Sequence, residues 1–184
     1  MSELTPDRVD ALAVETAIQI VKSLDGKQEI SPEELTALRT EVGATGLLLG
    51  FSSIVLSLVR LIDDHPEEFT FTDSIGIDQR VTGSSLIPAV LTSLSKKRVR
   101  ERDLPTAAGA LAAAAVRIPP SVWRLLFGPV AEEELEAWAR LAWFLSTLID
   151  RTRQDDGLAL NVVRDTIDMA VANPVQEESP SDDN

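Results

Sequence analysis

Apolar residues recur every three or four positions along most of the chain, which is the spacing of one face of an α-helix. A first helix is predicted from about residue 7 to 24, between Pro6 and Gly26. A second is predicted to begin at Pro32, because Ser31 can cap the first turn and proline suits the first helical position. The pattern therefore favours helices from the start of the chain.

A run of 18 residues from Val42 to Val59 carries no charge. Its large side chains form one helical stripe, and small side chains form another at Gly46, Gly50, Ser53 and Ser57. A stripe of small residues lets a second helix backbone come close, so we expect this seam to bind another helix or a second copy of the chain. Because glycine weakens a helix, a kink is predicted near residues 43–46.

This uncharged run is shorter than the roughly 20 apolar residues that a membrane span needs, and glycines and serines interrupt it. A helix that is apolar on both sides is instead typical of the centre of a fold. We therefore expect a buried central helix over residues 46–62 and no membrane span.

After residue 68, apolar and polar residues alternate along the chain, which is the pattern of a β-strand. One short β-hairpin is therefore predicted near residues 69–77. A helix is then predicted from about residue 84. It ends in the only basic cluster of the chain, which consists of Lys96, Lys97, Arg98, Arg100 and Arg102. Cations suit the negative end of a helix dipole, and they also suit an acidic or phosphate-bearing partner.

The second half of the chain predicts three more helices and a short helical turn near residues 122–127. An alanine-rich helix over 107–115 has little apolar area, so we expect it to pack closely on the glycine and serine seam. A long helix over 131–154 begins with acids and ends with arginines, which matches the helix dipole. A last helix is predicted over 160–171.

These patterns together predict an all-α domain over residues 1–172 with six to eight helices. The helices over 46–62 and 131–154 should lie at its centre. Residues 173–184 are acidic and nearly free of large apolar side chains, so we expect a disordered tail there.

The composition excludes or disfavours several classes of function. The chain has 30 acidic and 17 basic side chains, a net charge of −13, and this balance disfavours a wrapped nucleic-acid partner. It has no cysteine and a single histidine, so thiolate chemistry is excluded and the usual metal sites are disfavoured. The polar first ten residues do not form a secretory signal, and we expect a cytoplasmic protein.

Two stretches carry candidate metal-binding or acid–base groups. The densest is Asp63, Asp64, His65, Glu67 and Glu68, which we interpret as a solvated helix end. Residues 23–35 are locally similar to an EF-hand loop, with Asp25 and Glu34 at loop positions 3 and 12. Because Lys27 and Gln28 stand where a carboxylate and a glycine are needed, we interpret this stretch as a joint between helices. No catalytic, cofactor-binding or metal-binding residue is assigned, and whether these 13 residues bind a cation stays open.

The sequence favours a non-enzymatic protein that acts through protein–protein contacts, as an adaptor, regulatory or assembly factor that self-associates or binds another protein. The interaction residues would be the four of the seam and the five of the basic cluster. One alternative is a nucleic-acid-linked regulator that uses residues 96–102. Another is a helical enzyme or small-ligand binder with a pocket lined by Glu15, Glu41 or Asp150.

Overall fold

The structure is a computed structural model that describes residues 6–25, 31–65, 68–72, 78–80, 90, 104–116, 118, 122 and 129–172. These residues form five helices and one pair of short strands. In chain order they are α1 (Pro6–Asp25), α2 (Pro32–Asp64), β1 (Thr70–Thr72), β2 (Asp78–Arg80), α4 (Leu104–Ala115), α6 (Glu132–Arg153) and α7 (Leu158–Ala172). The all-α class predicted from the sequence is confirmed.

The number of helices differs from the prediction, since the described residues form five rather than six to eight. One reason is that the helices expected before and after residue 43 meet directly at Gly43, which is non-helical, and are counted together as α2. The kink predicted near residues 43–46 is thereby confirmed. The helix predicted from residue 84, almost all of the short turn near 122–127, and the acidic segment 173–184 lie outside the described residues.

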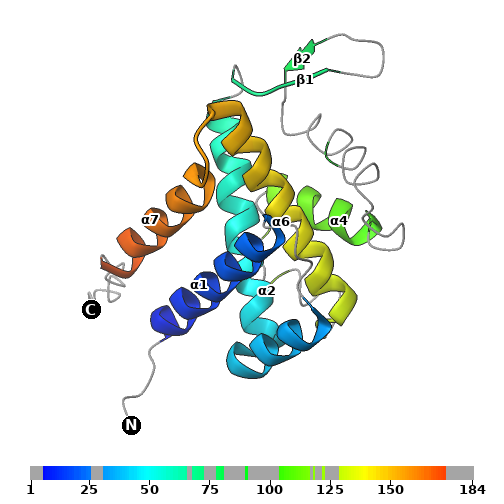
Figure 1. Ribbon diagram of the computed structural model, residues 1–184, viewed down its shortest axis with the longest axis vertical. Coiled ribbons are helices and arrows are strands. Elements are labelled where there is room, and N and C mark those ends of the chain that lie inside the picture. The colour runs from blue at the N-terminus through cyan, green and yellow to red at the C-terminus, as the bar shows by residue number, and fades with distance from the viewer. Residues whose placement is uncertain are drawn as a thin grey trace, which may run out of the picture.

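Helix α2 runs through the middle of the fold, with α1 crossing it and α6 beside it (Figure 1). Its apolar positions point inward, and each of the following side chains is at most 1% exposed: Leu47, Leu48, Phe51, Ile54, Val55, Leu58, Val59 and Ile62. Burial of this many large side chains is the main source of stability for such a domain. The prediction of a central helix over 46–62 is confirmed.

Helix α6 is the second central element. None of its side chains from Glu134 to Asp150 is exposed, because α1, α2, α4 and α7 all contact it. The helix ends at Gln154, which adopts a left-handed conformation, and Gly157 with φ of 85° completes the turn into α7. The sequence predicted this helix within one residue at each end.

The two strands pair antiparallel, with Phe71 opposite Gln79, and lie beyond the end of α2 (Figure 1). The first strand lies inside the predicted hairpin. The second begins at Asp78, directly after the stretch in which it was expected.

Among the described residues, one helix is long and apolar enough to cross a membrane, Thr36–Asp64. Half of its apolar window is buried inside the protein, and a core helix passes the same test of length and composition.

Candidate interaction site

The seam of small residues on α2 receives α1. A Cβ atom built on Gly50 would overlap the backbone oxygen of Ala13 and would stand 3.0 Å from the Cβ atom of Ala17. At Gly46, one turn earlier, the nearest atoms are 3.6 and 3.9 Å away, which is ordinary contact. Glycine at position 50 therefore lets the two helix backbones meet inside one chain.

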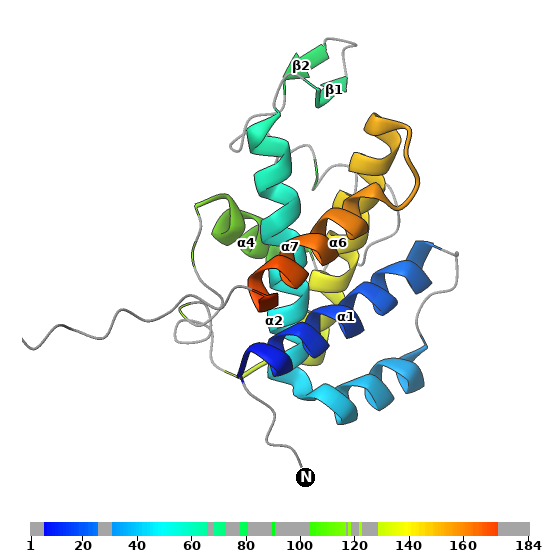
Figure 2. The ribbon, with the colours of Figure 1, turned by 90° about the vertical axis from the view of Figure 1, so that its left-hand side faces the viewer.

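The expectation that the alanine-rich helix packs on this seam is wrong at Gly50. That helix, α4, contacts the other side of α2, where Ala113 and Ala114 face Leu48, Ser52 and Leu56. Figure 2 shows α1 and α4 on opposite sides of α2. Both α1 and α4 offer small residues to α2, at Ala13 and Ala17 and at Ala113 and Ala114. Ser53 and Ser57 of the seam are half-buried.

A small hollow lies between α2 and α4. Its cavity volume is about 10 Å³, and the side chains of Leu48, Ser52, Leu56, Ala113, Ala114, Ile118 and Trp138 line it. A space of this size holds about one water molecule. Its lining side chains are mostly apolar, and the Ser52 hydroxyl donates a hydrogen bond to the Leu49 carbonyl of its own helix. None of the three candidate carboxylates lines this hollow.

Glu15 is held by a cation from another helix. Its two carboxylate oxygens accept hydrogen bonds from Nη2 and Nε of Arg164 at 3.2 and 3.3 Å, which joins α1 to α7. The hydrogen bond from Arg164 is the main reason that the pKa of Glu15 lies below its ordinary value, and a hydrogen bond from Gln19 adds to the effect. The fork of the guanidinium fits a carboxylate in this two-bond geometry.

Asp150 forms the junction between α6 and α7. Its carboxylate accepts hydrogen bonds from the backbone N–H groups of Gly157 and Ala159, each at 2.8 Å. The first N–H groups of a helix have no partner within that helix, and an acid there also suits the helix dipole. The carboxylate therefore caps α7 from the preceding helix.

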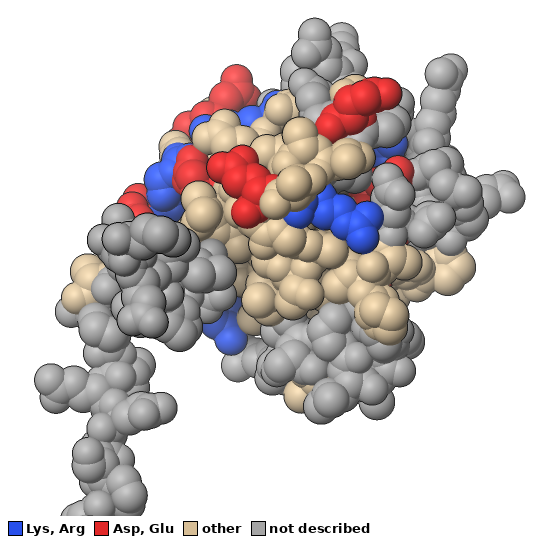
Figure 3. All heavy atoms as spheres, turned by 90° about the horizontal axis from the view of Figure 1, so that it is seen from below, with Lys and Arg blue, Asp and Glu red and all other residues tan. Residues whose placement is uncertain are grey.

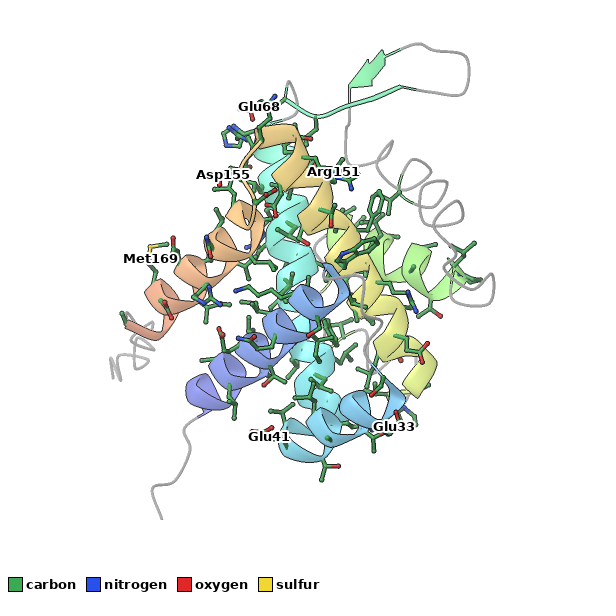
Figure 4. The ribbon with its side chains drawn as sticks, viewed as in Figure 1. Glu33, Glu41, Glu68, Arg151, Asp155 and Met169 are labelled. Atoms are coloured by element: carbon green, nitrogen blue, oxygen red, sulfur yellow. The ribbon has the colours of Figure 1, made fainter. Side chains whose placement is uncertain are left out.

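Glu41, the third candidate carboxylate, is exposed near the bend of α2, far from the end of α6 where Arg151 lies (Figure 4). The structure thus gives Glu15, Glu41 and Asp150 three different surroundings and does not bring them into one pocket.

The acidic stretch that follows α2 makes a link to the end of α6. Glu68 lies 2.6 Å from Nε of Arg153 and 3.8 Å from Nδ1 of His65 (Figure 4 labels Glu68). Asp63 is half-buried and Asp64 is exposed. Within the described part of the chain, no three histidine or acidic side chains gather in the way that a metal ion requires. Residues 26–30, inside the stretch similar to an EF-hand loop, lie outside that part.

Four large apolar side chains are exposed among those described: Leu12, Val116, Val122 and Met169. Met169 is 61% exposed on the outer face of α7 and points away from the other helices (Figure 4). On the face shown in Figure 3, acidic and basic side chains are interspersed, with uncharged surface between them. The predicted basic cluster, residues 96–102, lies outside the described residues.

Sequence reasoning missed the two polar junctions, Asp150 with α7 and Glu15 with Arg164. The first had a signal, because an acid in the last turn of one helix stood seven positions before Gly157, where the next helix begins. The second had none, since 149 positions separate the two residues.

Comparisons of this chain with protein-family models, with curated proteins and with solved structures found no match.

Proposed function

We propose that this protein acts in the cytoplasm through protein–protein contacts, as an adaptor, regulatory or assembly factor. The observation that carries the proposal is the exposure of several large apolar side chains among the described residues, of which Met169 on α7 is one. Methionine is enriched in protein–protein interfaces relative to the rest of the protein surface.

The pattern of α7 supports this choice of surface. Leu160 and Val163 are buried, whereas Asp165, Asp168 and Met169 are exposed. The helix therefore offers a partner one apolar anchor between acidic groups. An apolar anchor gives most of the affinity in such contacts, and charges around it select the partner.

A second copy of the chain is the first partner to test. Light scattering on purified protein should give a mass near twice 20.0 kDa if the chain self-associates. Met169→Lys should lower that mass toward the monomer, because a charge at the centre of an interface is costly to bury. Thr152→Lys is the matched control, since it adds the same charge to an exposed position of a different helix, α6. Equal effects of the two variants would contradict the role of Met169.

A different protein partner is tested by placing a photo-crosslinking residue at position 169 in the source cells, with position 156 as the control. A discrete crosslinked product from position 169 that survives nuclease is the expected result. A monomeric mass at every protein concentration, together with no discrete product from position 169, would overturn the proposal. Products that disappear with nuclease would favour the nucleic-acid alternative instead.

A further inference from the structure

Gly43 has a backbone conformation that other residues avoid. Its φ of 78° and ψ of 157° lie in a region that is populated essentially by glycine. A Cβ atom built there would meet no atom within 4 Å, so it is the backbone conformation and not crowding that requires glycine. The residue is exposed at the bend between two helical limbs of α2.

The two limbs differ in how the rest of the protein holds them. In the short limb, Pro32–Val42, none of the described side chains is buried, and Leu38 and Val42 only touch the edge of the core. In the long limb, Ala44–Asp64, eight large side chains are at most 1% exposed. Regions with few buried apolar contacts open at lower free energy than the core of the same protein.

We propose that Gly43 is a hinge about which the short limb swings away from the body as an intact helix, while the long limb stays packed. The motion needs a change of φ and ψ at Gly43, an exposed residue that has no side chain to collide, and the chain between Asp25 and Pro32 must follow the limb. It breaks the half-buried contacts of Leu38 and Val42 and leaves the contact of Ala13 with Gly50 in place.

When the short limb swings out, an apolar side of this helix becomes exposed to solvent. Leu38 and Val42 are four positions apart and therefore lie on one side of the short limb. In the closed state this side faces the core, and in the open state it is available to solvent. The fold thus holds a device that covers and uncovers an apolar helix edge, and it acts independently of the Met169 surface.

Hydrogen exchange on the unmodified protein gives the first test. Backbone amides of residues 34–42 should exchange at least about 100-fold faster than those of residues 50–62, because the short limb opens without global unfolding. Equal protection of the two limbs would overturn the proposal.

Spin-label distances distinguish a hinge from local melting, and the absence of cysteine makes labelling specific. A pair at Glu33→Cys and Arg151→Cys joins the short limb to the far end of α6 (Figure 4). Its distances should be broadly distributed, whereas the body pair Lys22→Cys and Arg151→Cys should give a narrow distribution. A pair at Glu33→Cys and Ala37→Cys should stay short, because the limb remains helical. Broadening of this last pair would show melting and would overturn the hinge.

Gly43→Ala gives the decisive comparison. Alanine disfavours a positive φ and favours the helix, so the broad distribution from Glu33 to Arg151 should become one narrow population at longer distance. Gly46→Ala is the matched control, because position 46 is already helical and has room for a methyl group. An unchanged distribution in Gly43→Ala would overturn the proposal, and if this variant does not fold, the pairs Glu33→Cys with Arg151→Cys and Glu33→Cys with Ala37→Cys, which keep Gly43, decide between a rigid limb, a hinge and melting.

Discussion

Asp150, in the last turn of α6, lies 2.8 Å from the backbone nitrogen of Ala159, in the first turn of α7. The same carboxylate binds the N–H of Gly157 through its other oxygen. One side chain therefore satisfies two N–H groups at the positive end of the following helix and sets the direction in which α7 leaves α6.

Asp150→Ala should lower the free energy of unfolding by about 1–2 kcal/mol, which is the usual effect of losing a helix cap. Urea denaturation followed by circular dichroism measures this difference. Asp156→Ala is the control, because Asp156 is an exposed acid in the same turn and its loss should change stability by less than about 0.5 kcal/mol. Similar losses in the two variants would show that general charge, rather than the cap, is responsible.

Gly50→Ala and Gly46→Ala should have opposite effects. At position 50 the new methyl group meets the backbone of Ala13, and forcing the helices apart should cost about 1–3 kcal/mol. At position 46 the methyl group fits, and the better helix propensity of alanine should stabilise the fold by up to about 1 kcal/mol. Thermal unfolding of both variants gives the comparison. A stabilised Gly50→Ala protein would contradict the close approach of α1 and α2.

The pair of Glu15 and Arg164 should make stability depend on pH. Because the pKa of Glu15 is lowered in the folded protein, its contribution is present above about pH 4.5, its ordinary value, and is lost as the pH falls through the lowered value. The Glu15 side chain is 45% exposed, so the contribution should be below about 1 kcal/mol.

Glu15→Gln should therefore be less stable than the natural protein at pH 7, and the two should converge once the pH lies below the lowered pKa of Glu15. Arg164→Met should remove most of the difference at pH 7, since the arginine is the main cause of the pKa shift. A gap between Glu15→Gln and the natural protein that does not shrink as the pH falls below 4.5 would show that charge at Glu15 is not its source.

Gln154→Gly should stabilise the protein by about 0.5–1 kcal/mol. Gln154 ends α6 with φ of 54° and ψ of 37°, a left-handed conformation that glycine adopts without strain. Thr152→Gly, two positions earlier within the helix, should destabilise it by about 0.3–0.5 kcal/mol, because glycine is a poorer helix former than threonine. Chemical denaturation of the two variants should give shifts of opposite sign.

Elements with strong periodicity were predictable from the sequence. The long helix was expected over 131–154 and runs over Glu132–Arg153, since its acids, arginines and apolar positions all agree. The kink of α2 was predictable from three glycines within eight residues. The exact position of the break was not predictable, because any of the three glycines could have supplied it and only the backbone shows that the non-helical residue is Gly43.

The packing partners could not be predicted. Ala13 and Ala17 of α1 and the alanines of α4 are equally suited to a seam of small residues, so spacing alone did not decide which helix occupies it. The pocket expected around Glu15, Glu41 or Asp150 could not be tested from the sequence for a related reason. A sequence shows where carboxylates lie along the chain, but it does not show that Arg164 reaches Glu15 or that two N–H groups reach Asp150.

The junction of Asp150 with α7 and the junction of Glu15 with Arg164 also differ in when both of their partners have been synthesised. The bonds of Asp150 join residues seven and nine positions apart, so this corner can close as soon as both helices emerge. The bond between Glu15 and Arg164 spans 149 positions, which at about 5–20 residues per second delays it by roughly ten seconds or more. Helix α1 and Gly50 are therefore both available for packing long before α7 is synthesised, and the bond from Arg164 can join only afterwards.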